Sequence, residues 1–181
     1  MAQEAEAEPS ALFQAERARL TAALGPVLDP ACGRGRHALA AARLGRFVIA
    51  LDRSRSRLAE LARTSRAGAL PVQPLLADVE ASGTLPLASE SCGAVLVFRY
   101  LHRPLAPEIV RVLRPGGLLL YETFTRKQRE IAEHPRNPAF LLEPGELPAL
   151  FSALETLRAE EALVQAPERE AVARLVARKR A

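Results

Sequence analysis

A buried strand, a glycine-containing loop and a helix follow one another at residues 27–45, and this segment constrains the fold more than any other. Gly33 and Gly35 permit a sharp turn and a close approach of the backbone to a ligand, because neither carries a Cβ atom. Asp29 precedes the loop, and Asp52 ends the next apolar run, 17 residues after Gly35. In nucleotide-binding βαβ units an acidic residue at that place binds the ribose hydroxyls. The segment therefore predicts a parallel βαβ unit with a ligand at its carboxyl end.

The rest of the chain continues this alternation of apolar runs and helical patterns. We expect residues 1–10 to be a mobile tail and residues 11–181 to form one domain, because the sequence contains no repeat or linker. The expected strands are 27–28, 47–51, 72–76, 94–98, 118–122, 154–164 and 171–177; the expected helices are 11–24, one that Gly45 terminates, 54–68, 105–113 and 144–154; and 80–92 and 123–142 are expected to be connections.

Four short motifs lie at the ends of these elements. They are the 29–35 loop, Asp52, the Ala77-Asp78 pair after the third apolar run, and Leu113-Arg114-Pro115-Gly116-Gly117 before the fifth. Together they resemble the class I (Rossmann-like) S-adenosylmethionine-dependent methyltransferases, from about residue 25 to the end of the chain. The resemblance implies a mostly parallel seven-stranded sheet with helices on both faces and an antiparallel C-terminal strand. It also implies S-adenosylmethionine as the cofactor and in-line methyl transfer as the reaction.

Three later runs refine this placement. Residues 98–104, 135–138 and 141–147 are most similar to the small, uncapped, tellurite-resistance branch of the family. Gly93 stands where the family commonly opens its fourth strand with Asp, and Ala31 replaces the first glycine of the loop. We therefore expect the turn at Ala31 to keep a conformation that alanine tolerates.

The resemblance assigns cofactor contacts residue by residue. A carboxylate at Asp29 would face the cationic amino-acid end, and Asp52 would bind the ribose. Arg53 can stack its guanidinium plane on the adenine. Asp78 would bond the adenine amine, with the Val79 backbone against the ring, although an Asp after a strand is equally often a helix or turn cap. The predicted cofactor-binding residues are Asp29, Ala31, Cys32, Gly33, Gly35, Asp52, Arg53, Asp78, Val79 and Phe98.

The acceptor side is expected where the fourth strand ends, because open α/β sheets bind ligands at the carboxyl ends of their strands. The long 123–142 connection predicts either a lid over the methyl group or a surface crossover. Arg99, Arg103, Arg126 and Arg136 would give the pocket positive potential and attract an anionic acceptor. A soft nucleophile needs little base catalysis. The predicted catalytic residues are Tyr100 and His102, and the predicted substrate-binding residues are Arg99, Arg103, Arg136 and Asn137, with Arg126 adding positive charge.

Composition limits the remaining classes. The net charge is +4 with a pI near 9.7, but aromatic residues make up only 4% of the chain and do not alternate with Arg, so RNA stays an open partner. Cys32 and Cys92 have no metal-ligand spacing, so neither a disulfide framework nor a metal site is predicted. No run is long enough to span a membrane, and we expect a cytoplasmic enzyme acting on a small molecule. The sequence predicts no oligomeric state.

Three other functions remain open at this stage. Gly33-x-Gly35-x-x-Ala38 satisfies a weak dinucleotide fingerprint, which would make the chain an NAD(P)-dependent oxidoreductase. The spacing argues against it, because four residues separate the first strand's apolar pair from Gly33, and no Tyr-x-x-x-Lys follows. An RNA methyltransferase and a noncatalytic S-adenosylmethionine-binding protein are the other two.

Overall fold

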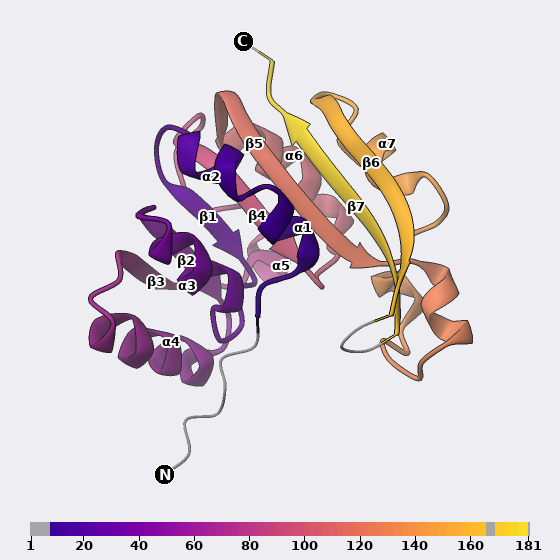
Figure 1. Cartoon of the computed structure of the whole chain (residues 1–181), viewed down its shortest axis with the longest axis horizontal. Helices are drawn as coiled ribbons and strands as arrows, with labels where there is room; N and C mark the ends of the chain where they lie inside the picture. Colours follow the sequence, from indigo (N-terminus) through magenta and orange to yellow (C-terminus); the bar gives the residue numbers. More distant parts are fainter. Residues whose placement is uncertain (1–7, 166–168, 181) are drawn as a thin grey trace.

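The computed structural model describes residues 8–165 and 169–180, so most of the expected N-terminal tail lies outside the described residues. Seven strands form one sheet in the order β3-β2-β1-β4-β5-β7-β6 (Figure 1). The first five are parallel, and β7 runs antiparallel to both of its neighbours, which confirms the predicted fold class. The strands are β1 (Val27–Pro30), β2 (Val48–Asp52), β3 (Val72–Leu76), β4 (Cys92–Phe98), β5 (Leu113–Phe124), β6 (Glu155–Val164) and β7 (Glu170–Arg178).

Helices cover both faces of this sheet. Figure 1 shows α1 and α3 in front of the sheet and α6 behind it. The apolar residues separate accordingly into two cores, one shared by α1 to α4 and the other by α5 to α7. The helices are α1 (Ala11–Ala15), α2 (Arg17–Ala22), α3 (Arg36–Arg43), α4 (Arg55–Ala67), α5 (Val79–Ser82), α6 (Ala106–Val112) and α7 (Glu146–Leu150), and the 3-10 turns are η1 (Arg103–Leu105), η2 (Arg126–Glu130) and η3 (Pro138–Phe140).

Several predicted elements differ from the observed ones. The helix expected at 11–24 is interrupted at Glu16, whose buried carboxylate accepts a hydrogen bond from Arg19 at 2.6 Å. The expected 80–92 connection begins as a short helix, because α5 extends from Val79 to Ser82. The helix expected at 144–154 ends at Leu150, because Phe151 turns into the core ahead of β6.

The fifth strand is longer than predicted. It begins at Leu113, which pairs with Cys92, and regular pairing resumes only at Leu118, opposite Ala94. The Pro-Gly-Gly run therefore lies within a bulged strand, whereas the sequence pattern indicated a break between helix and strand.

Gly93 is the most crowded of the glycines. Its N–H donates to the carbonyl of Pro26 at 2.8 Å, and a Cβ atom added to it would lie 2.6 Å from the carbonyl carbon of Leu24 and closer still to its oxygen. Any side chain there would collide with main chain that cannot rotate away. This contact explains why the Asp that commonly opens the fourth strand is absent.

Candidate active site

A cavity of about 410 Å³ opens where the parallel strands end. Residues from the carboxyl ends of β2, β3, β4 and β5 line it, together with the loop after β1, Arg57 of α4, and Pro135 and Phe140 in the connection after β5. This is the edge at which open α/β sheets bind their ligands. The lining residues are Ala31, Leu51, Asp52, Arg53, Arg57, Ala77, Asp78, Val79, Glu80, Arg99, Tyr100, Leu101, Thr123, Phe124, Pro135 and Phe140.

Asp52 organises the glycine loop. It is the last residue of β2 and is 5% exposed. Its Oδ2 accepts the N–H of Gly33 at 2.8 Å, and its Oδ1 accepts the N–H of Ser54, also at 2.8 Å. Each carboxylate oxygen can accept more than one hydrogen bond. The side chain can therefore hold the loop in place and still accept ligand hydroxyls from the cavity.

Gly35 is required by packing as well as by conformation. Its φ is +84°, which disfavours any residue with a Cβ, and an added Cβ would collide with the side chain of Leu61 in α4. Ala31 has a φ of +58°, in the left-handed region. The expectation of an alanine-tolerant turn is therefore wrong. The loop keeps the left-handed conformation that glycine would favour, and alanine carries the strain.

Asp29 lies in β1, one residue before its end, and is almost fully buried. Burial raises the pKa of Asp29 to about 8, and the nearby Asp52 carboxylate adds to the rise. Arg36, the first residue of α3, opposes the rise only weakly. The carboxyl group is therefore mostly protonated at neutral pH until a cation approaches it.

Cys32 has no features of a nucleophile. Burial is the main factor that raises the pKa of its thiol, and the carboxylates of Asp29 and Asp52 raise it further. The thiolate is the reactive form, so a thiol held neutral is inert. Cys32 lies outside the cavity lining and packs against the core shared by α1 to α4.

Asp78 is both a helix cap and a cavity residue. Its Oδ1 accepts the N–H groups of Glu80 and Ala81, each at 3.1 Å, which fixes the start of α5. Both bonds use the same oxygen, and Asp78 and Val79 line the cavity. The cap and the ligand role foreseen as alternatives are thus compatible. Arg53 lines the same wall and pairs with Glu80 at 3.4 Å.

Tyr100 carries a hydroxyl group that is buried beside the cavity. Among residues 8–165 and 169–180, no group forms a well-oriented hydrogen bond with that hydroxyl, although the Glu80 carboxylate lies near enough to act on it. Burial raises the pKa of Tyr100, and the nearby Glu80 carboxylate raises it further, so the group remains a proton donor. The Tyr121 hydroxyl holds the Tyr100 carbonyl at 3.0 Å. A buried donor without a partner is a site for a polar atom of a ligand.

Arg99 adopts a left-handed backbone conformation at the end of β4, with a φ of +55°. Its guanidinium pairs with Glu170 at 2.7 Å and lies 5.9 Å from the ring centroid of Phe124. Strained residues of this kind concentrate at functional sites. Arg99 lines the cavity, but its charge is balanced by a carboxylate from β7.

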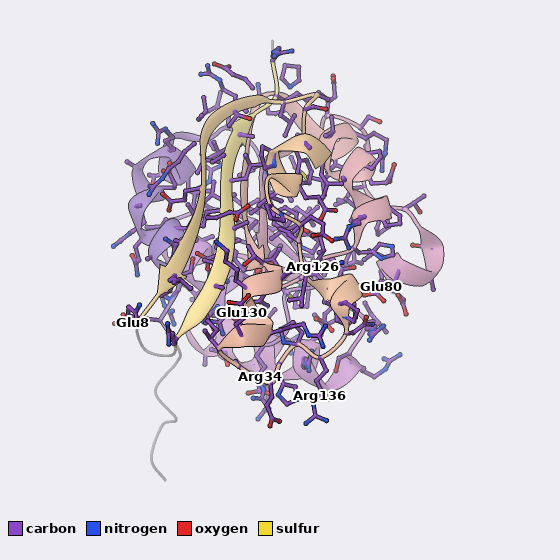
Figure 2. The ribbon with its side chains drawn as sticks, turned by 90° about the vertical axis from the view of Figure 1, so that its right-hand side faces the viewer. Glu8, Arg34, Glu80, Arg126, Glu130 and Arg136 are labelled. Carbon is purple, nitrogen blue, oxygen red and sulfur yellow. The ribbon has the colours of Figure 1, made fainter. Side chains whose placement is uncertain are left out.

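Asp29, Cys32, Gly33, Gly35 and Phe98 of the predicted cofactor residues do not line the cavity, and neither do four of the predicted acceptor-side residues. The ring of Phe98 stacks on His37, with centroids 3.7 Å apart. His102 precedes η1, and the side chain of Asn137 caps η3 by accepting the N–H of Ala139 at 2.9 Å. Figure 2 shows Arg136 at the edge of the molecule, where its side chain is 73% exposed. The fourth residue, Arg103, binds main chain and carboxylate on the 123–142 connection and α7.

The arginines expected to attract an anion are all neutralised. Each forms an ion pair with a glutamate, and three of the four lie outside the cavity lining. Their charge therefore gives the cavity no net positive potential. The pairs are Arg99 with Glu170 at 2.7 Å, Arg103 with Glu146, Arg126 with Glu143 at 2.6 Å, and Arg136 with Glu133 at 3.0 Å.

Apart from Phe124, Pro135 and Phe140, which lie in the connection expected to be a lid or a crossover, five lining residues with polar or bulky side chains were not predicted from the sequence. They share one positional signal, because each lies at, or within a few residues of, the carboxyl end of a parallel strand or on the helix that follows it. A position near a strand end is therefore the sequence signal for these residues, whether or not they are acidic. They are Leu51, Arg57, Glu80, Leu101 and Thr123.

Comparison with known protein families identifies this architecture. The methyltransferase domain family matches residues 27–117, which is half of the chain. The chain belongs to this family. The match begins at β1 and ends within β5, so it includes the glycine loop, Asp52, Asp78 and the carboxyl ends of β2, β3 and β4, but not that of β5. No curated protein sequence matches this methyltransferase at a significant level.

Solved structures show the same fold. TehB from Haemophilus influenzae is 19% identical with a TM-score of 0.74, over 93% of this chain and 61% of that one. This methyltransferase therefore spans less than two thirds of the TehB chain. An S-adenosylmethionine-dependent methyltransferase from Mesorhizobium loti is 17% identical, with a TM-score of 0.70, over 94% and 99% of the two chains. A protein described in the conversion of a disulfide bond into a thioacetal group during echinomycin biosynthesis is 22% identical, with a TM-score of 0.76, over 98% and 84%.

The part of the chain that the structure describes contains no helix long and apolar enough to cross a bilayer.

Proposed function

We propose that this chain is an S-adenosylmethionine-dependent methyltransferase that methylates a small, soft acceptor. One observation carries the proposal. The cavity combines the acidic ends of β2 and β3 with an apolar wall made by Tyr100, Phe124 and Phe140. The acidic strand ends suit the hydroxyl and amine groups of a nucleoside, and the apolar wall suits a small acceptor molecule beside it.

The residues present fit the cofactor. Asp52 would accept the ribose hydroxyls, and Asp78 would accept the adenine amine through the oxygen that the helix cap leaves free. Arg53 lies on the same wall for stacking. Asp29, buried near the end of β1, would face the ammonium group of the amino-acid end. When bound, S-adenosylmethionine supplies an electrophilic methyl group on a sulfonium.

The chain contributes alignment and exclusion of water. Methyl transfer is accelerated chiefly by holding the acceptor in line at near-contact distance. Tyr100 stays protonated, and His102 lies outside the cavity lining, so neither is placed to remove a proton as a base. The acceptor must then arrive as a competent nucleophile, such as a thiolate or a neutral amine. The hydroxyl of Tyr100 would donate to it or to the cofactor.

The charges in the cavity disfavour an oxyanion as acceptor. Its lining holds three arginines and three carboxylates, and Arg99 is neutralised by Glu170. A dinucleotide-dependent oxidoreductase is disfavoured too, because β7 is inserted antiparallel between β5 and β6, whereas the doubly wound dinucleotide fold is mostly parallel.

Transfer of labelled methyl groups tests the proposal. The protein is incubated with labelled S-adenosylmethionine and, separately, with small thiols, amines, tellurite and structured RNA. We expect labelled product from a small thiol or amine. Product from RNA alone would overturn the small-acceptor proposal.

Asp29 gives the cofactor site a predicted pH dependence. Below pH 8 the free protein holds Asp29 mostly protonated. The α-amino group of S-adenosylhomocysteine, like that of other free amino acids, is cationic at neutral pH. Binding therefore releases a proton, and affinity must rise with pH. Between pH 6.5 and 7.5 we expect a gain of about five- to tenfold, measured by calorimetry in two buffers of different ionisation enthalpy.

Two controls isolate Asp29. Asp29→Asn should bind the same ligand without proton release, and 5′-methylthioadenosine, which lacks the amino-acid end, should bind the wild type with a flat profile. If wild-type affinity for S-adenosylhomocysteine is unchanged between pH 6.5 and 7.5, Asp29 does not contact the ammonium group.

A further inference from the structure

Arg103 forms four side-chain hydrogen bonds with other segments, and none of their partners lines the cavity. It lies in η1, five residues after the end of β4, and its side chain crosses to α7 and the 123–142 connection. Its Nε and Nη2 bind the two carboxylate oxygens of Glu146, the latter at 2.9 Å. Such a two-pronged arginine–carboxylate pair fixes both distance and orientation.

The remaining bonds of Arg103 surround Phe140. Nη1 donates to the carbonyl of Ala139 at 2.7 Å, and Nη2 donates to the carbonyl of Leu141 at 3.0 Å. These carbonyls lie immediately before and after Phe140, whose side chain lines the cavity while remaining 45% exposed. The guanidinium therefore holds the peptide on both sides of an aromatic ring that little else covers.

Glu146 completes the arrangement. Its Oε2 also accepts the N–H of Glu143 at 2.8 Å, so the carboxylate joins Arg103 to the chain that follows Phe140. The pair is mostly sheltered, with side-chain exposures of 34% and 20%. The hydrogen bond between them raises the pKa of Arg103 and lowers that of Glu146, so both stay charged.

From this geometry we propose that Arg103 and Glu146 form a latch that holds Phe140 as the outer wall of the cavity. Arg103 is thus a positioning residue for that wall, in place of the substrate contact expected from its sequence position. The latch joins the segment after β4, which carries Tyr100 and Leu101, to the segment that carries Phe140. Only the statement that this wall meets the methyl acceptor rests on the proposed function; the latch itself can be tested without turnover.

A tryptophan reporter makes the latch measurable. The chain contains no Trp, so Phe140→Trp introduces a single emitter at the wall. In this background we expect Arg103→Met to raise acrylamide quenching at least twofold, with Arg103→Lys and Glu146→Gln intermediate, because each keeps part of the hydrogen bonding. In the protein with native Phe140, Arg103→Met should speed amide exchange at residues 139–142 by about tenfold or more.

Arg126 offers a matched control on the same segment. It pairs with Glu143 at 2.6 Å, but its side chain is 59% exposed and lies outside the cavity lining. Exposed pairs contribute little. Arg126→Met should therefore leave quenching and exchange unchanged, and affinity for S-adenosylhomocysteine should stay within twofold in all variants.

The outcomes separate clearly. If Arg103→Met fails to fold, Glu146→Gln carries the test, because it keeps the shape of the Glu146 side chain and removes its negative charge. Equal quenching and exchange in the Arg103→Met and Arg126→Met proteins would overturn the latch. A latch confirmed in a protein that methylates nothing would leave the latch standing and reject the proposed function.

Discussion

Replacing Asp52 by alanine is expected to weaken the binding of S-adenosylhomocysteine by about 10- to 100-fold. Hydrogen bonds to a charged group contribute about 1.5–3 kcal/mol, and that free energy corresponds to this range of affinity. The loss has two sources. The ribose hydroxyls lose their acceptor, and the N–H groups of Gly33 and Ser54, each 2.8 Å from the carboxylate, lose the group that holds the loop.

The comparison with Glu80→Gln makes the Asp52 prediction specific. Glu80 also lines the cavity, but its carboxylate forms a long, exposed ion pair with Arg53, acts on the Tyr100 hydroxyl, and accepts no hydrogen bond from the glycine loop. Calorimetry should show a large loss for Asp52→Ala and a loss of less than threefold for Glu80→Gln, with circular dichroism confirming that both variants fold. A folded Asp52→Ala protein with unchanged affinity would remove Asp52 from the site.

Replacing Gly93 by alanine is expected to lower the free energy of unfolding by about 3 kcal/mol, at the upper end of the usual overpacking cost. The added Cβ would meet the carbonyl group of Leu24 and lie 3.3 Å from the nitrogen of Gly25. Both partners are main chain, so relief requires moving the segment that leads into β1. Gly93→Asp, which restores the residue common in the family, should be at least as damaging.

Gly83 provides the control for Gly93. It has a φ of +66°, and a Cβ atom added there would have no neighbour within 4 Å, so Gly83→Ala carries only backbone strain, about 1–2 kcal/mol. Urea denaturation measures both variants. Equal losses for the two would show that the segment at Leu24 yields easily and that crowding does not select Gly93.

The main features of the fold were accessible from the sequence because each parallel strand leaves a local pattern. The apolar run at 72–76 and the Ser54 and Gly68 boundaries of α4 appear where they were predicted. The limits of β5 did not, because its first residue pairs with Cys92 across a bulge that depends on β4 and not on local sequence. Pairing between distant strands is invisible to periodicity.

The same distinction holds for the candidate site: the residues at strand ends could be predicted, and the contacts between distant residues could not. Asp52 and Asp78 could be predicted, since their positions at strand ends follow from the order of elements. The partners of the arginines could not, because Glu146 lies 43 residues from Arg103 and Glu170 lies 71 from Arg99. Without those carboxylates the arginines suggest a positive pocket. With them, each arginine is paired with a carboxylate of the same chain, and the apolar wall becomes the feature that distinguishes the acceptor side.

Calorimetric titration of the wild-type protein with S-adenosylhomocysteine and, separately, with NADPH tests the assignment of the cavity most directly. We predict saturable binding of one S-adenosylhomocysteine per chain and no heat of binding with NADPH. Binding of NADPH alone would contradict the assignment, because the cavity at the ends of β2 and β3 would then hold a dinucleotide.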